Sequence, residues 1–249
     1  MTLKDVLIAD ALLGSHGGGG GGISLDDIAQ NIEPSGDITL STVTRIKSNA
    51  FRSKPITSII APNVTAVESD ALNGTLIEEI TDANFPNITT DASCFNYMPS
   101  LKSLKLTRWT NLKNGSGAIR GNTNLLTFEA PYNTTETGNA FAHSNTKMTL
   151  CDIGSCISIA GSSFYNCSAL KTLIIRRSDA ICALSNIGAF TGSPFKSGGV
   201  GGTIYIPEAL YNHLGDGTAL DYKAANNWST VNGYGTITWA KIEGSPYEL

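Results

Sequence analysis

Residues 164–175 read FYNCSALKTLII and contain the two landmarks of a repeat that extends over residues 43–175. The first landmark is a bulky apolar residue, Phe164 in this copy, that usually follows a small residue. It recurs in steps of 21, 23, 24, 22 and 23 residues. The six copies are Ala50-Phe51, Ala71-Leu72, Cys94-Phe95, Ala118-Ile119, Ala140-Phe141 and Ser163-Phe164.

The second landmark is a short apolar motif that follows each bulky residue. Its copies are Ile56-x-x-Ile59, Ile77-x-x-Ile80, Leu101-x-x-Leu104-x-Leu106, Leu125-x-x-Phe128, Met148-x-Leu150 and Leu170-x-x-Leu173-x-Ile175. A fixed period of this length indicates one supersecondary unit per repeat, stacked as a solenoid. We expect each unit to contribute a short strand with every second residue inward, and the first landmark to fill the coil interior on the return path.

The bulk composition supports a folded, turn-rich chain. Of its 249 residues, 41% are hydrophobic and 15% are charged, and the formal net charge is −4. Disorder requires high charge and few apolar residues, so the composition disfavours it. Nucleic-acid binding calls for a basic stripe, whereas the densest basic cluster here is Arg176-Arg177. We therefore expect no nucleic-acid partner.

The N-terminal sequence predicts neither a membrane span nor a signal peptide. Its most apolar stretch, residues 6–13, is too short to cross a bilayer and contains Asp10. No small-residue cleavage motif follows it. We expect synthesis in the bacterial cytoplasm, after which the chain either stays there or leaves by lysis. A third alternative, a mature form whose signal was removed, is disfavoured by Met1.

The five cysteines do not have the paired spacing of a disulfide framework. Cys94 and Cys167 fall beside first landmarks, where a small apolar side chain fits, so we expect buried free thiols. Cys151 and Cys156 are close in sequence, but no second cysteine pair or nearby histidine completes the four ligands of zinc. We predict no metal site.

Residues 1–37 are predicted to form an N-terminal helical arm. Residues 1–14 and 24–32 each have the pattern of a short helix. Between them lies a glycine run, which is either a flexible linker or a place where several chains pack closely because glycine lacks Cβ. The residues predicted to anchor the protein or to hold a homo-oligomer are Leu3, Leu7, Gly17, Gly18, Gly19, Gly20, Gly21 and Gly22.

The remaining chain is predicted to divide into a solenoid, residues 38–200, and a C-terminal α+β cap, residues 201–249. A glycine-rich break at residues 198–202 precedes a last strand over residues 203–207. Short helices are expected over residues 208–214 and 219–228, and a closing strand over residues 233–242. The predicted fold class is a β-rich α/β solenoid of short parallel strands.

Four stretches share a common pattern. They are Ala61-Pro-Asn-Val-Thr-Ala-Val67 followed by Ala71-Leu72, Phe85-Pro-Asn-Ile-Thr89, Ser48-Asn-Ala-Phe51, and Phe164-Tyr-Asn-Cys-Ser-Ala-Leu170. The pattern resembles that of BspA-type leucine-rich repeats, roughly L-x-x-h-x-h-P-x-x-V-T-x-I-x-x-x-A-F-x-x-C, where h is apolar. Residues 204–229 resemble the tail that commonly closes such arrays.

The resemblance covers residues 37–245 and implies a right-handed leucine-rich repeat coil. It also implies adhesion or recognition rather than catalysis. Similar repeats occur on bacterial surface proteins and in phage-encoded proteins. The sequence departs from the pattern where Ile119 replaces phenylalanine, and the cysteine of the pattern is present only at Cys167.

No sequence pattern indicates catalysis. His16, His143 and His213 are far apart, and the motifs of a nucleophile elbow, a phosphate-binding loop, a zinc protease and a dinucleotide site are absent from the sequence. We therefore predict a non-enzymatic protein with no catalytic residue and no cofactor.

The strand face is the predicted binding surface, because solenoids present long regular faces. Its expected outward residues are Thr57, Glu79, Lys105, Thr127, Glu129, Thr149, Lys171 and Ile174. Beyond Lys105, the adjacent Arg108 and Trp109 are residue types common at interface hot spots, although Trp109 has the alternative of packing on the next coil. Tyr132 and Tyr165 lie at predicted turns, where they suit either carbohydrate stacking or ordinary turn structure.

These features favour a structural and recognition protein of a phage or prophage particle, located in the virion. The arm would contact other virion proteins or a second copy of the chain, giving a homo-oligomer. The repeats would contact a host surface protein or glycan. The alternative is a bacterial cell-surface adhesin that binds a protein or a glycan.

Overall fold

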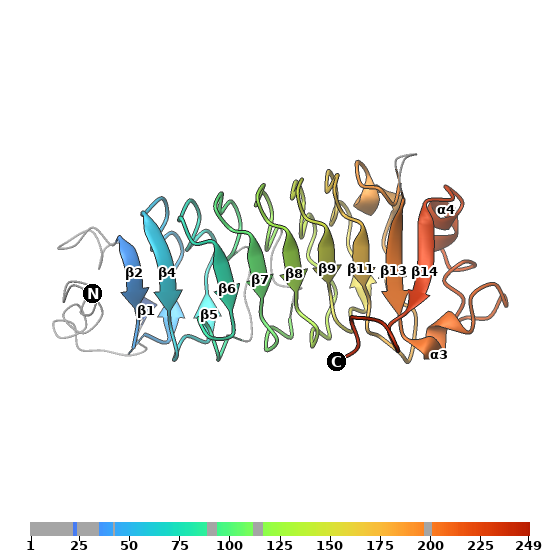
Figure 1. Ribbon diagram of the computed structural model, residues 1–249, viewed down its shortest axis with the longest axis horizontal. Helices are drawn as coiled ribbons and strands as arrows, with labels where there is room; N and C mark the ends of the chain where they lie inside the picture. Colours follow the sequence, from blue (N-terminus) through green and yellow to red (C-terminus); the bar gives the residue numbers. More distant parts are fainter. Residues whose placement is uncertain (1–21, 24–34, 42, 89–93, 112–116, 197–200) are drawn as a thin grey trace.

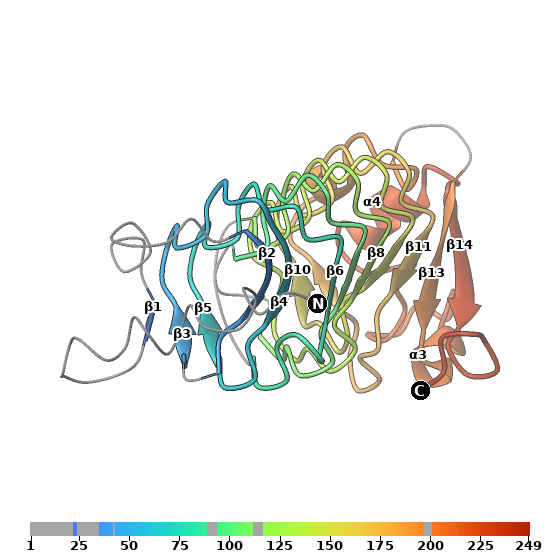
Figure 2. The same ribbon diagram turned by 60° about the vertical axis from the view of Figure 1, so that its left-hand side comes forward.

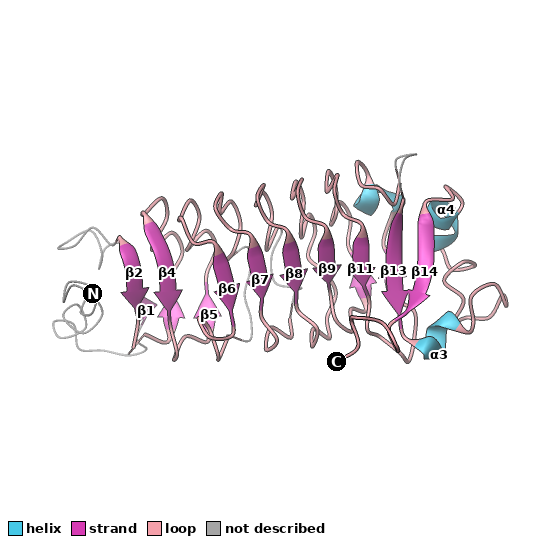
Figure 3. Cartoon of the chain, in the orientation of Figure 1, coloured by secondary structure: helices cyan, strands magenta, loops and turns pink. Residues whose placement is uncertain are grey.

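The computed structural model describes residues 22–23, 35–41, 43–88, 94–111, 117–196 and 201–249. They form an elongated solenoid in which successive coils stack side by side (Figure 1). Strands and turns make up nearly all of it, and the helices lie towards its C-terminal end (Figure 3). The predicted solenoid of short parallel strands is therefore confirmed. Within these residues, no helix has the length and apolar character needed to cross a membrane.

A parallel sheet of seven strands, in the order β14-β13-β11-β9-β8-β7-β6, forms the main face. The strands are β6 (Glu79–Thr81), β7 (Ser103–Lys105), β8 (Thr127–Glu129), β9 (Leu150–Asp152), β11 (Thr172–Ile174), β13 (Gly202–Ile206) and β14 (Ile237–Lys241). Their register creates one buried inward column: Ile80, Leu104, Phe128, Cys151, Leu173, Ile204 and Trp239. Each coil therefore stacks its inward side chain on that of its neighbour.

The other strands complete the coils. On the main face, β2 (Gly36–Thr39) pairs with β4 (Ile56–Ile60). On the return path, β1 (Gly22–Ile23), β3 (Arg45–Ile46) and β5 (Ala66–Val67) form one sheet, and β10 (Ser158–Ile159) pairs with β12 (Ala183–Leu184). Figure 2 shows β1, β3 and β5 lying away from β2, β4 and β6.

The described residues of the predicted N-terminal arm include strand β1 and the beginning of β2. Gly22, the last residue of the glycine run, belongs to β1 and pairs in parallel with Arg45 of β3. Both predicted helices lie outside the described residues, as do Leu3, Leu7 and residues 17–21.

The interior contains a ladder of aromatic rings that passes from coil to coil. Neighbouring ring centroids are 5.3 to 6.4 Å apart, mostly in edge-to-face contact, a geometry that aromatic quadrupoles favour. Its members are Phe85, Phe95, Trp109, Phe128, Phe141, Phe164 and Phe190. All are fully buried, as are the six predicted first landmarks, whose interior position is therefore confirmed.

Each coil turns into its main strand through one residue in the left-handed conformation, with φ between 49° and 76°. These residues are Ser53, Gly74, Tyr97, Gly121, Ser144, Asn166 and Gly192. Glycine adopts this conformation without strain, and serine and asparagine adopt it at small cost. A bulky side chain there is unusual, which makes Tyr97 the exception in the column.

A small polar side chain closes five of these turns from the inside: Thr75, Asn122, Asn145, Cys167 and Ser193. Asn122 donates from Nδ2 to the carbonyl of Phe95 at 2.6 Å, and Oδ1 of Asn145 accepts from the amide of Asn122 at 2.8 Å. Cys167 occupies the same place, and its thiol donates to the carbonyl of Ala142 at 3.0 Å. Asparagine therefore takes the role of the pattern's cysteine, because both reach a carbonyl of the neighbouring coil.

The fifth coil contains one extra residue in its turn. Ten residues separate Phe141 from its inward strand residue Cys151, whereas nine separate Phe164 from Leu173. A shift by one residue reverses the face to which a strand side chain points. Leu150, predicted to point inward, therefore stands on the outward face of β9 and is only partly buried.

The C-terminal cap contains both predicted strands, but only part of its predicted helices. Helix α3 covers Glu208–Tyr211, and α4 covers Trp228–Asn232, so the helix predicted over residues 219–228 is wrong. The carboxylate of Asp221 accepts from the amides of Gly217 and Lys223, which holds this segment in turns instead.

Aromatic side chains of the cap close the end of the core. The indole N–H of Trp228 donates to the carbonyl of Cys182 at 2.6 Å, and the amide of Cys182 donates to the hydroxyl of Tyr222 at 2.8 Å. The Trp228 ring also packs against Phe190 at the end of the 3₁₀ turn η1 (Ile187–Phe190). The core is thereby covered at the end where stacking stops, as solenoids require.

Candidate binding surfaces

The outward strand face carries two rows of side chains, one on each side of the inward column. The first row is Glu79, Ser103, Thr127, Leu150, Thr172, Thr203 and Thr238. The second row is Thr81, Lys105, Glu129, Asp152, Ile174, Tyr205 and Ala240. Members of a row are one strand spacing apart, about 4.8 Å, so neighbours in a row interact directly.

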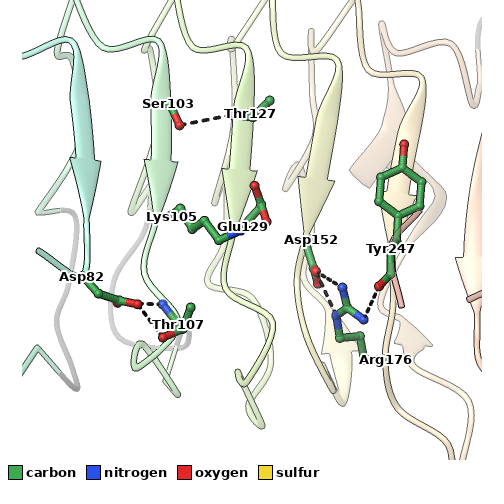
Figure 4. A network of polar contacts seen from close by, with 9 residues as sticks. All are labelled: Asp82, Ser103, Lys105, Thr107, Thr127, Glu129, Asp152, Arg176 and Tyr247. Atoms are coloured by element: carbon green, nitrogen blue, oxygen red, sulfur yellow. Dashed lines mark hydrogen bonds and ion pairs between the residues drawn. The ribbon is translucent and has the colours of Figure 1, made fainter. Parts of the chain in front are cut away.

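Charges on this face are paired between adjacent coils. The ammonium of Lys105 lies 2.9 Å from a carboxylate oxygen of Glu129 (Figure 4), and that of Lys102 lies 2.7 Å from Glu78. These pairs are exposed to solvent, so each contributes about 0–1 kcal/mol to stability. Their more important consequence is that Lys102 and Lys105 already have carboxylate partners within the chain.

The C-terminal tail covers one end of the strand face. Arg176 holds Asp152 through Nε at 2.8 Å and Nη2 at 2.7 Å, and its Nη1 donates to the carbonyl of Tyr247 at 2.9 Å (Figure 4). The Tyr247 ring also packs edge-on against Tyr205 at 4.7 Å. Burial raises the pKa of Asp152, and the Arg176 guanidinium partly offsets this rise.

Ile174 corrects the prediction of an open strand face. It points outward in register with Tyr205, yet only 1% of it is exposed. The tail residue Tyr247 lies at this part of the face, where it packs on Tyr205 and accepts a hydrogen bond from Arg176. The sequence pattern gave the direction of the Ile174 side chain correctly but could not show its burial or the position of the tail.

The predicted cluster of Lys105, Arg108 and Trp109 is not a continuous binding patch. Trp109 is 0% exposed and stacks between Phe95 and Phe128, so the alternative of packing in the core is the correct one. Arg108 is exposed, and its guanidinium lies 3.3 Å from Oδ1 of Asn87 in the previous coil. Lys105 belongs to the paired strand face.

The two predicted tyrosines lie on opposite edges of the solenoid. Tyr132 is 56% exposed in the turn that follows β8. Tyr165 is 41% exposed in the turn that precedes β11. Because the turns before the strands and those after them form the two edges of the stack (Figure 1), these rings cannot contact the same small ligand.

Tyr165 has three neighbours that the sequence analysis did not identify. Tyr97, Arg120, His143 and Tyr165 occupy the turns before β7, β8, β9 and β11, one from each of four successive coils. Backbone hydrogen bonds hold these turns in register, from Tyr97 N to Arg120 O at 2.8 Å, from Gly121 N to His143 O at 2.9 Å and from Ser144 N to Tyr165 O at 2.9 Å. We call these four residues the aromatic edge.

The side chains of the aromatic edge contact one another in two pairs, Tyr97 with Arg120 and His143 with Tyr165. The Tyr97 ring lies over Gly121, where an added Cβ would come within 2.5 Å of the ring. The Arg120 guanidinium lies over the same ring, 5.7 Å from its centroid. The His143 and Tyr165 rings are stacked, with centroids 4.8 Å apart and planes at 15°. Partial burial, followed by the positive charge of Arg120, lowers the pKa of His143.

A signal for this row was present in the sequence. Arg120 and Tyr165 each come one residue after a first landmark, and Tyr97 and His143 come two residues after one. Aligning the landmarks would have placed all four on the same edge. The prediction instead followed the strands, where side-chain direction is easier to infer.

Within the part of the chain that the structure describes, the remaining histidines and cysteines do not form a recognisable reactive arrangement. The Ser144 hydroxyl lies 2.7 Å from Nδ1 of His143, but the ring is stacked on Tyr165. His213 contacts Asp216 at 2.6 Å in the cap. Burial raises the pKa of the Cys167 thiol to about 12, and the five cysteines are buried. No group of three histidine, cysteine, aspartate or glutamate side chains in the described ranges has the arrangement of a metal site.

Comparison with known proteins supports the repeat pattern. The family described as BspA type leucine rich repeat region matches the chain in six copies, over residues 34–147 and 88–197. None of the curated proteins matches the chain. A crystal structure of a leucine-rich repeat protein from Bacteroides ovatus is similar at 11% identity and a TM-score of 0.19, covering 82% of this chain and 84% of that one. A TM-score this low carries no structural argument.

Proposed function

The chain belongs to the BspA-type leucine-rich repeat family, and on this premise we propose that it is a non-catalytic recognition protein that binds its partner through the solenoid surface. The observation that carries the proposal is the aromatic edge. Tyr97 and Tyr165 are 43% and 41% exposed, and both belong to turns that backbone hydrogen bonds hold in register. A rigid row of exposed rings suits binding, because little side-chain freedom remains to be lost on association.

The more specific proposal is that the protein is a component of a phage or prophage particle. In this arrangement residues 1–37 attach it to other virion proteins or to copies of itself, and the repeats contact the host surface. The alternative is a cell-surface adhesin of a bacterium. The family is compatible with both locations, the particle and the cell envelope, and a fractionation experiment distinguishes them.

Mass spectrometry of two fractions from one induced culture of the source strain distinguishes these locations. The fractions are density-purified particles and the washed cell envelope. Enrichment in particles is expected for a virion component. Enrichment in the envelope would contradict the particle proposal and favour the adhesin.

Recognition itself is tested separately from location. The purified full-length chain, carrying a fluorescent label, should bind saturably to intact cells of its host strain and be displaced by excess unlabelled protein. Arg108→Gln and Tyr132→Ser provide controls, because they alter exposed side chains away from the aromatic edge. The absence of saturable cell binding by the unmodified chain would overturn the recognition function.

A further inference from the structure

We propose that the aromatic edge is a binding site for an acidic glycan, with sugar rings stacked on Tyr97, His143 and Tyr165 and a carboxylate held by Arg120. This inference rests on the recognition function proposed above and specifies its ligand class. The site is a row parallel to the solenoid axis, with one residue from each of four successive coils.

The first argument is the form of the row. Strand spacing of about 4.8 Å places Tyr97 and Tyr165, three coils apart, about 14 Å from each other along the axis. The face of an aromatic ring has a negative electrostatic potential, and it attracts the polarised C–H groups on the face of a sugar ring. A repeating ligand such as an oligosaccharide matches a surface whose own contacts repeat from coil to coil.

The second argument is the charge of this edge. Residues 94–102, 117–126, 138–149, 160–171 and 186–196, which include the turns before the strands, contain no aspartate or glutamate. They contain five lysines and arginines, of which Lys102 is paired with Glu78 at the strand face. The whole chain has a net charge of −4. Lys147 and Lys196 bond to an amide and a hydroxyl, Asn124 Oδ1 and Thr191 Oγ1, rather than to carboxylates. An anionic ligand is therefore attracted to this edge rather than to the strand face.

The third argument is the state of Arg120. Its guanidinium rests over the Tyr97 ring, and within the described residues it makes no hydrogen bond or ion pair. By contrast, Lys105 and Arg176 contact carboxylates in neighbouring coils. A guanidinium held by a ring still offers its N–H groups at the edge, where a ligand carboxylate can accept two parallel hydrogen bonds.

The surroundings of the rings favour a glycan over a protein partner. Protein hot spots lie in well-packed pockets that become fully desolvated. Of the large exposed aliphatic residues, Leu126 lies in the segment before β8, and Ile60, Leu76 and Ile157 lie outside the turns of the aromatic edge. The residues beside the rings are instead polar or lack side chains: Gly121, Ser144, Asn166 and Gly192. Such groups suit the hydroxyls of a sugar.

Isothermal titration with three uronic-acid hexamers, of galacturonate, mannuronate and the hyaluronan type, provides the direct test. We expect at least one to bind and its fully methyl-esterified form to bind at least about tenfold more weakly, the loss corresponding to one charge-assisted pair. Binding of none of the three, or equal binding of acid and ester, would overturn the proposal. Tighter binding of oligothymidylate than of every hexamer would reassign the edge to single-stranded nucleic acid and also overturn it.

The variants test which residues carry the binding. Arg120→Gln removes the charge, and Tyr97→Asn removes a ring while placing at this position a residue that tolerates its φ of 49°. Each should weaken hexamer binding at least about tenfold without lowering the melting temperature substantially. The matched controls Arg108→Gln and Tyr132→Ser should bind as the unmodified chain does. Equal weakening by variants and controls would contradict the site.

The cell-binding assay separates failure of this site from failure of the proposed function. If the unmodified chain binds cells and the Arg120→Gln and Tyr97→Asn variants bind equally well, the recognition function holds and the aromatic edge is not its site. If binding to cells and to the hexamer falls together in both variants, both proposals are supported.

Discussion

The strand face and the aromatic edge are built from the same repeat, yet they treat charge differently. On the strand face, Lys105 is paired with Glu129 one coil away, and Asp152 with Arg176. On the aromatic edge, Arg120 rests on the Tyr97 ring in a region without carboxylates. The difference shows that coil stacking alone does not define a binding surface. A surface whose charged groups pair with one another contributes to solubility and stability. A surface with a cation that lacks a carboxylate partner is available to an anionic ligand.

The largest loss of stability should come from a change in the aromatic interior, which supports both the strand face and the aromatic edge. Phe141→Ala removes a ring that contacts Phe128 at 5.3 Å and Phe164 at 6.4 Å, and should cost about 3–5 kcal/mol of unfolding free energy. Urea denaturation measures the loss, and Phe141→Leu should cost less because it leaves a smaller cavity. An unfolding free energy unchanged by Phe141→Ala would contradict the aromatic ladder.

The next largest loss of stability should come from a change at the end of the strand face that the C-terminal tail covers. Arg176→Met leaves the Asp152 carboxylate buried without its cation, and should cost up to about 3 kcal/mol at neutral pH. Because burial raises the pKa of Asp152, and loss of Arg176 raises it further, the folded state of the variant favours the protonated acid. Stability of the variant should therefore fall as pH rises through that pKa.

Thermal denaturation at several pH values tests this sign. The difference in melting temperature between Arg176→Met and the unmodified chain should be smaller near pH 4 than at pH 7. The double variant that also carries Asp152→Asn should lose most of the added pH dependence. A gap that widens on acidification would contradict the burial of Asp152.

A smaller effect should come from the turns beneath the aromatic edge. Asn145→Ala removes the acceptor of the buried Asn122 amide and the donor to the carbonyl of Ile119, and should cost about 1–3 kcal/mol. Asn145→Cys should retain part of this stability, because Cys167 serves the same position in the next coil. Equal losses in the two variants, measured by urea denaturation, would show that the inward polar group does not matter.

The smallest effects on stability should come from the two exposed cations. Lys105→Met breaks an exposed ion pair and should cost about 0–1 kcal/mol, and Arg120→Met loses a cation–π contact of similar size. Calorimetric melting should therefore hardly separate them, while binding of the acidic hexamer should fall only in Arg120→Met. A loss of hexamer binding in Lys105→Met would remove the distinction between the two regions.

The fold followed from the sequence because the landmarks recur at nearly fixed spacing, which determines inward and outward directions in most coils. The fifth coil was misread because one added residue in the turn shifts Cys151 to the inward position. The burial of Ile174 was not foreseen, because the tail that reaches this part of the face, where Tyr247 bonds to Arg176, comes from a distant part of the chain. Such long-range coverage leaves no local pattern in the sequence.

The candidate site was partly accessible from the sequence. Tyr165 was identified as an exposed turn residue, whereas Trp109 was offered as a contact residue although its ring fills the core between Phe95 and Phe128. Residue type suggested Trp109, and only the three-dimensional arrangement excludes it. Tyr97 was missed because the prediction followed the strands, whereas this ring stands in the turn before β7.

Amide chemical-shift mapping by NMR, during titration of the full-length chain with an acidic hexamer that binds it, tests the central claim most directly. The account predicts that the largest shifts lie in the turns before the strands, around Gly121, His143 and Tyr165. Shifts concentrated on β7, β8 and β9 would contradict it and assign recognition to the strand face.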